Sequence, residues 1–245
     1  MTKIDMTLQD WLEEKPFTLS LSSGFFGFFA HAGFMKALEE RGLKAHSFTG
    51  SSAGAIIAAA GARGMNAKEI QELVLGVKLK DFWDPALGLG FVRGKRFENL
   101  LRKTIGGEFE KLEAPLRIAT FDILKRRTEV FTTGDLAKAI RASCAVPLMF
   151  HPVRIGKSLY WDGGVLDKMA LTGVGETEKV LAHYLNGKNV YEVYERRRDE
   201  KTWQGHRQVV ALENLQRSGP YKMHLGPEIL ASAYRQTLVR LDAKI

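Results

Sequence analysis

Cysteine is nearly absent from this sequence. The only one, Cys144, excludes an intramolecular disulfide, and a chain without disulfides fits a reducing compartment. The N-terminus also lacks a basic start followed by an apolar core, so we expect no secretory signal. Together these absences predict a cytoplasmic protein.

Long unbroken apolar runs are missing as well. Residues 17–35 carry no charged side chain and are long enough to span a bilayer, but serines, glycines and a histidine interrupt them. A membrane span prefers continuous apolar residues, and this stretch divides more naturally into a strand and a helix. We therefore expect no transmembrane segment here.

The charge is unbalanced toward lysine and arginine, with a formal net charge of +8. A basic surface attracts nucleic acid, anionic lipid or acidic partners. Neither of the two densest basic segments is interleaved with aromatic residues as single-strand binders are, so we expect no nucleic-acid partner. The pattern favours a solvated helix face or, as the alternative, peripheral contact with an anionic membrane. The segments consist of Arg93, Lys95, Arg96, Arg102 and Lys103, and of Arg196, Arg197 and Arg198.

The chain is large enough for one substantial core, with 245 residues of which 45% are hydrophobic. It contains no internal repeat or low-complexity tract. We predict a single domain over residues 1–245, with residues 1–16 as an N-terminal extension.

The first 64 residues alternate between strand and helix patterns. Residues 17–22 alternate apolar and polar, and residues 45–49 form a second short strand. Residues 30–41 and 52–63 have helical patterns, and a glycine follows each of them, at Gly42 and Gly64. This order predicts a parallel sheet covered by helices.

The later elements are shorter. Residues 80–94 contain three glycines and a proline and predict a loop or lid. We expect helices at 97–105, 136–143 and from Pro227 onward, and strands at 116–123, 128–133, 159–162, 180–184 and 208–212.

The turn Gly50-Ser51-Ser52-Ala53-Gly54 is the first candidate for chemistry. It follows a predicted strand and precedes a predicted helix, which is the context of a nucleophile elbow. Gly50 and Gly54 leave room for the sharp turn, and the positive end of the helix favours a developing oxyanion. The pattern predicts Ser52 as a nucleophile; the alternative is that Ser51 or Ser52 only caps the helix.

A second turn, at residues 22–29, lies between the first strand and the first helix. Ester hydrolysis requires backbone N–H donors aimed at the tetrahedral oxygen, and Gly24, Phe25 and Phe26 are the candidates. The phenylalanines of this turn are candidates for an acyl-chain pocket, although at least two of them fit a buried core. The glycine spacing does not satisfy a dinucleotide-binding fingerprint.

A serine nucleophile needs a base. None of the six histidines lies in a distinctive local motif. Among the carboxylates, Asp162 follows a predicted strand and precedes Gly163 and Gly164, so it lies at the sheet edge where α/β sites form. It is the leading candidate for the base, with a simple Asp-Gly turn as the alternative.

In their order along the chain, these motifs resemble those of the patatin-like phospholipases. The resemblance covers the turn at residues 19–33 with its Ala-His-x-Gly, the nucleophile motif at 50–54, the block Arg-Ala-Ser-Cys-Ala-Val-Pro at 141–147, and the Asp-Gly-Gly of 162–164. It departs from the family in two places. The first turn has phenylalanines where the family has further glycines and a basic residue, and Lys168-Met169-Ala170 stands where the family usually has an Asn-Pro or Leu-Pro pair.

The resemblance implies a three-layer α/β/α fold with a mainly parallel central sheet. It implies a Ser52–Asp162 dyad without histidine, an oxyanion hole near Gly24, Phe25 and Phe26, and structural roles for Gly50, Gly54 and Gly163. It further implies hydrolysis of acyl esters in phospholipids or related lipids through an acyl-enzyme, with no metal and no other cofactor.

The sequence is also compatible with two alternatives. One is an esterase or acyltransferase with a Ser-Asp-His triad that draws on His183, His206 or His224. The other is a non-catalytic or weakly active lipid-binding protein on the same fold, which the altered first turn suggests.

Overall fold

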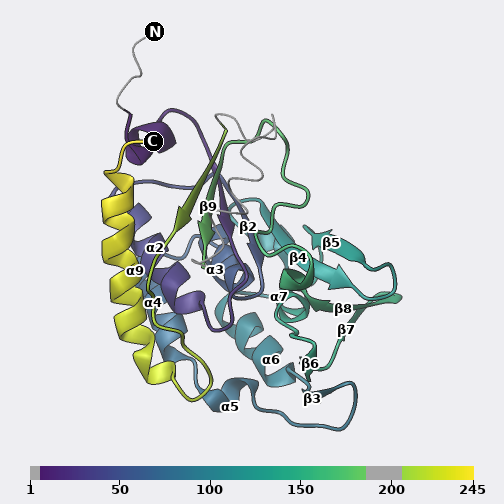
Figure 1. Cartoon of the computed structure of the whole chain (residues 1–245). Coiled ribbons are helices and arrows are strands. Elements are labelled where there is room, and N and C mark those ends of the chain that lie inside the picture. The colour runs from purple at the N-terminus through teal and green to yellow at the C-terminus, as the bar shows by residue number, and fades with distance from the viewer. Residues whose placement is uncertain (1–5, 186–205) are drawn as a thin grey trace.

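The computed structural model describes residues 6–185 and 206–245. Its centre is an eight-stranded sheet in the order β10-β9-β1-β2-β4-β8-β7, with β5 paired to β4 and helices packed around it (Figure 1). The pairs from β10 to β4 are parallel, whereas β5, β7 and β8 join in antiparallel fashion. The predicted α/β/α class with a mainly parallel sheet is confirmed.

The first part of the sheet follows the predicted order. It consists of β1 (Thr18–Leu21), α2 (Phe28–Glu40), β2 (Ser47–Ser51) and α3 (Ala53–Ala62). Helix α2 begins earlier than its pattern predicts because Gly27 accepts the N–H groups of the first turn. Residues 17–35 thus divide between a buried strand and a helix. Among the described residues, no helix is long and apolar enough to cross a membrane.

Most of the later elements also match the prediction. Helices α1, α4 and α5 and strands β3, β6 and β7 were not expected, and the basic run at 196–198 lies outside the described residues. The other α-helices and strands of the described residues are α1 (Leu8–Glu13), α4 (Ala67–Gly76), α5 (Leu79–Phe82), β3 (Gly90–Val92), α6 (Lys95–Thr104), β4 (Leu116–Asp122), β5 (Arg127–Phe131), α7 (Leu136–Ser143), β6 (Leu148–Phe150), β7 (Val153–Ile155), β8 (Ser158–Asp162), β9 (Val180–Tyr184), β10 (Arg207–Ala211) and α9 (Gly226–Leu241).

The strand register brings two distant segments together. Strand β2 pairs with β4 so that Ser51 lies beside Ala119. Strand β4 pairs on its other side with β8, where Thr120 lies beside Asp162. The end of β2 and the end of β8 therefore meet across β4, although they are far apart in the sequence.

The segment between α4 and α6 is more ordered than the predicted loop. It contains the short helix α5 and strand β3, which pairs with β6 to form a separate two-stranded sheet. The buried carboxylate of Asp84 accepts the N–H groups of Gly94 and Lys95, each at 2.7 Å, and so caps the start of α6. The middle of the segment and its C-terminal end are thereby fixed.

Two close contacts tie the helices to one another. Helix α2 packs on α9 at Gly33, where an added Cβ would lie 2.2 Å from the carbonyl oxygen of Leu230. Helices α6 and α7 are joined by the buried ion pair of Glu98 with Arg141. The apolar core lies between these helices and the sheet, and Leu19, Phe34 and Ile57 are completely buried in it.

The space around two helix glycines predicts different effects when each is replaced by alanine. Gly33→Ala should lower the free energy of unfolding by about 1–3 kcal/mol, because the new methyl group displaces the α9 backbone. Gly76→Ala, at the end of α4 with open space around it, should be neutral or raise it by up to about 1 kcal/mol. Urea unfolding of both variants checks this, and equal effects would contradict the close α2–α9 contact.

Candidate active site

Ser52 occupies a strained turn between β2 and α3. Its backbone has φ 53° and ψ −123°, a conformation that costs a residue with a side chain on the order of 1–3 kcal/mol. The two motif glycines permit the turn: a Cβ on Gly54 would lie 2.0 Å from the carbonyl oxygen of Leu21, and one on Gly50 would lie 2.7 Å from the Cα of Ala55. Ser52 stands at the cap position of α3, but its side chain makes no capping hydrogen bond.

The end of α7 holds this turn in place. The N–H of Ser52 donates to the hydroxyl oxygen of Ser143 at 2.8 Å, and that hydroxyl donates to the carbonyl of Ala119 at 2.7 Å. The next residue, Cys144, donates its thiol to the carbonyl of Ser52 at 3.2 Å. Both backbone groups of Ser52 are therefore anchored by side chains of one segment.

The hydroxyl of Ser52 donates to Asp162 instead of to its own helix. Its Oγ lies 2.6 Å from Oδ2 of Asp162, while Oδ1 accepts the N–H of Gly164 at 2.8 Å. Gly163 allows β8 to approach β4 and β2, because a Cβ there would lie 2.2 Å from the carbonyl oxygen of Ala119. The carboxylate is thus fixed by one hydrogen bond on each oxygen.

The burial of Asp162 sets its proton affinity. Removal from water raises the pKa of this carboxyl to about 6, against the opposing effect of the hydrogen bonds from Ser52 and Gly164. At neutral pH the carboxyl is therefore ionised, yet it takes up a proton more readily than an exposed aspartate. This combination suits a general base that must later return its proton.

No histidine takes part in this arrangement. All six histidines fall within the described residues, and none of them lines the cleft that contains Ser52. His183, one of the predicted triad candidates, is fully buried and stacked on Phe34 with a centroid distance of 4.1 Å. His206 and His224 are exposed outside the cleft. The geometry gives the triad alternative no base.

Two of the histidines instead form a hydrogen-bonded chain that ends at the start of the first turn. The Nε2–H of His31 donates to the carbonyl of Ser22 at 2.9 Å, because a carbonyl can only accept. The Nδ1 of neutral His31 then accepts from Nδ1–H of His183 at 2.8 Å. Burial lowers the pKa of His31 to about 4 and that of His183 well below its usual value, so both rings stay neutral.

The turn at residues 24–27 has free backbone donors. The N–H of Gly27 donates to the carbonyl of Gly24 at 2.8 Å, and Phe26 has φ 56°, a value that favours glycine. Among the described residues, the N–H groups of Gly24, Phe25 and Phe26 find no acceptor. All three residues line the same cleft as Ser52, so their donors are available to a ligand there.

The phenylalanines of this turn divide into two pairs. Phe28 and Phe29 are buried in the core, whereas Phe25 and Phe26 line the cleft. Phe26 packs against Phe82 of α5 with a centroid distance of 5.5 Å, which stabilises its unusual backbone. Leu185 lies so close to Gly24 and Gly27 that a Cβ at either position would clash with it.

The cleft itself has a volume of about 1130 Å³. Its wall combines apolar and polar side chains, and Lys168 and Arg217 are the cations on it among the described residues. One side comes from residues 212–218, a segment that the sequence does not single out. The apolar lining consists of Phe25, Phe26, Ala30, Val146, Pro147, Met149, Val165, Leu185, Leu212, Leu215 and Ile229.

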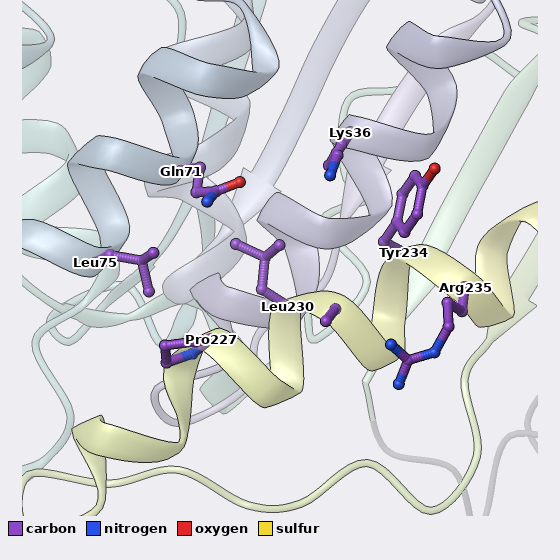
Figure 2. Close-up of a pocket in the computed structure, with 8 residues that line it drawn as sticks. Lys36, Gln71, Leu75, Pro227, Leu230, Tyr234 and Arg235 are labelled. Atoms are coloured by element: carbon purple, nitrogen blue, oxygen red, sulfur yellow. The ribbon is translucent and has the colours of Figure 1, made fainter.

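A second pocket, of about 330 Å³, lies between α2, α4 and α9 (Figure 2). Leu230 and Tyr234 of α9 face Lys36 and Gln71 across it. It contains neither Ser52 nor Asp162. In the part of the chain that the structure describes, no group of three or more histidine, cysteine or acidic side chains could hold a metal ion.

The sequence of this chain is similar to that of known proteins. A family model described as patatin-like phospholipase matches residues 19–174. An uncharacterized NTE family protein of Mycobacterium tuberculosis is 31% identical over 176 residues, which cover 69% of this chain and 49% of the relative. Lysophospholipase NTE1 of Pyricularia oryzae is 27% identical over 151 residues, 58% of this chain and 10% of that protein. The chain spans about half the length of the first of these relatives.

A solved structure shares the fold. VipD from Legionella pneumophila superposes with a TM-score of 0.68 at 17% identity, over 93% of this chain and 67% of that chain. At this identity the likeness concerns the arrangement of the sheet and helices alone.

The raised pKa of Asp162 predicts that removal of its charge stabilises the protein. Between about pH 4 and 6 the folded state holds a proton that the unfolded chain has lost, so this group lowers stability as the pH rises. Asp162→Asn keeps two hydrogen-bonding atoms and removes the buried charge. Its free energy of unfolding should exceed that of the wild type by up to about 3 kcal/mol at pH 8, and the gain should shrink toward pH 4.

Urea unfolding across this pH range is the measurement, with Asp122→Asn as the control. Burial raises the pKa of Asp122, but the N–H of Lys125, the Ser158 hydroxyl, the N–H of Leu124 and the charge of Lys125 together outweigh this and the pKa is lowered. The control should therefore be less stable than the wild type at pH 8. A loss of stability at pH 8 in Asp162→Asn would show that the buried charge carries no such penalty.

Proposed function

Because this chain belongs to the patatin-like phospholipase family, we propose that it is a lipid acyl hydrolase with Ser52 as nucleophile and Asp162 as general base. The observation that carries the proposal is the 2.6 Å hydrogen bond from the Ser52 hydroxyl to a buried carboxylate, within a cleft that no histidine lines. Because Asp162 can accept the proton of the Ser52 hydroxyl directly, the reaction needs no histidine to carry it.

In the first half of the reaction, Ser52 Oγ attacks the ester carbonyl while its proton passes to Asp162. The tetrahedral oxygen takes hydrogen bonds from the free N–H groups of Gly24, Phe25 and Phe26, and one such donor lowers the barrier by roughly 3 kcal/mol. Protonated Asp162 then gives its proton to the departing alkoxide, which leaves Ser52 acylated.

In the second half, Asp162 removes a proton from water. The resulting hydroxide attacks the acyl-enzyme, and Asp162 returns the proton to Ser52 as the fatty acid leaves. A pKa of about 6 lets one carboxyl perform both steps, because neither protonation state is strongly disfavoured near neutral pH.

The lining of the cleft favours a lipid substrate. The apolar side chains of its mixed lining suit acyl chains, and Lys168 and Arg217 can bind the anionic phosphate of the same lipid. These features support phospholipids as the substrate class. A cytoplasmic enzyme that contacts a membrane peripherally is part of the same proposal, since the substrate resides in a bilayer.

The neighbouring serine of the same turn is a matched control for the nucleophile. Ser52→Ala should lower kcat/KM for a soluble acyl ester more than about a thousandfold, because no nucleophile remains. Ser51→Ala should keep nearly full activity, because the buried Ser51 hydroxyl has no hydrogen-bond partner among the described residues. Fatty acid release measured by titration decides this. Equal activity of the two variants would refute the assignment, and an inactive wild type would favour the lipid-binding alternative.

Ser143 should act as a positioning residue, because it holds the strained Ser52 backbone. Ser143→Ala should lower kcat roughly tenfold or more and leave KM within about twofold. The control is Ser47→Ala, which removes a buried hydroxyl from the other end of β2, where it bonds Thr18. Steady-state kinetics and unfolding of both variants separate the two effects. If both lose the same stability and the same kcat, Ser143 has only a structural role.

A further inference from the structure

Five large apolar side chains protrude from the segments that form the small sheet. They come from the connection between α5 and β3, from β3 itself and from the start of β6. Monomeric soluble proteins rarely expose a large contiguous apolar patch unless the patch has a partner. This group, the apolar rim, consists of Trp83 (52% exposed), Leu87 (102%), Leu89 (67%), Phe91 (75%) and Leu148 (75%).

The backbone under the apolar rim is firmly held. Gly90 lies against β6 so closely that a Cβ would meet the carbonyl carbon of Phe150 at 2.4 Å. The N–H of Ala86 donates to the carbonyl of Phe91 at 3.1 Å, which closes the loop between them. Leu148 has φ 69°, a strained conformation for leucine, and directs its side chain outward. The exposure of these side chains is therefore a property of the fold.

The apolar rim adjoins the mouth of the cleft. Leu148 lies between Pro147 and Met149, both of which line the cleft. Trp83 follows Phe82, whose ring packs on Phe26 of the turn at residues 24–27. A surface that covered the apolar rim would therefore also lie next to the cleft opening.

The charge around the apolar rim has one predominant sign. Lys78, Lys80, Arg93 and Arg96 are exposed and form no ion pair with a carboxylate of the described residues. The acidic side chains of the same segment face inward. Asp84 is buried on the N–H groups that start α6, and Glu98 is buried against Arg141. Only Asp81 is partly accessible, and it accepts the N–H of Lys78.

We propose that the apolar rim inserts into an anionic lipid bilayer, with these four cations on the lipid phosphates and the cleft opening onto the membrane. Exposed apolar side chains with unpaired cations next to them along the chain match the two layers of such a membrane, the acyl region and the anionic head groups. A protein partner would instead need a matching acidic and apolar face. The choice of a lipid bilayer as the partner rests on the proposed function, but binding to the bilayer does not require catalysis.

The test uses the inactive Ser52→Ala chain, so that binding is measured without lipid turnover. The chain is mixed with phosphatidylcholine vesicles that contain or lack phosphatidylglycerol, and binding is measured by flotation. Phosphatidylglycerol should strengthen binding roughly tenfold or more, and added salt should weaken it. On the same background, Leu87→Ser with Phe91→Ser should weaken binding roughly tenfold or more. Val239→Ser, an exposed apolar residue on α9, is the control and should leave binding unchanged.

Two results would overturn the proposal. One is binding of the Leu87→Ser and Phe91→Ser chain at the strength of its Ser52→Ala parent. The other is the absence of binding to either vesicle, which would point to a protein partner for the apolar rim.

Hydrolysis of a soluble short-chain ester keeps this test separate from the proposed function. With Ser52 intact, the Leu87→Ser and Phe91→Ser chain should hydrolyse that ester at the wild-type rate, because neither residue lines the cleft. A wild type that fails on the ester while its Ser52→Ala form binds vesicles would refute the hydrolase and leave the docking surface standing. A wild type that cleaves the ester while the Ser52→Ala form fails to bind vesicles would refute the docking surface and support the hydrolase.

Discussion

The hydrogen bond from Ser52 to Asp162 is the interaction around which the rest of the site is arranged. It requires the ends of β2 and β8 to meet across β4, and glycines at 50, 54 and 163 to allow the backbones so close together. It also requires a strained serine and a buried carboxylate, both of which cost stability. The core and the hydrogen bonds from α7 must offset that cost.

Local patterns explain why much of this could be predicted from the sequence. The alternation of strand and helix over the first 64 residues, the elbow at Ser52 and the strand end at Asp162 each depend on neighbours within a few residues. The resemblance to a family then joined the two candidates, because no spacing rule relates residues that lie 110 positions apart.

Other features depend on contacts that no local pattern carries. Ser143 meets Ser52 across 91 positions, and its hydroxyl looks like any other serine at a helix end until the fold is known. Strand β6 has only three residues and pairs with β3, which was expected to be a loop. The phenylalanines of the first turn read alike in the sequence, and only the packing assigns Phe28 and Phe29 to the core and Phe25 and Phe26 to the cleft.

The central claim is that a buried aspartate, without a histidine, activates Ser52. The most direct measurement is the rate at which a fluorophosphonate labels Ser52 as a function of pH, in the wild type and in Asp162→Asn. If Asp162 is the base, the wild-type rate falls about tenfold for each pH unit below 6, and the variant reacts slowly at every pH. Labelling of Asp162→Asn at the wild-type rate, with the same pH profile, would contradict it.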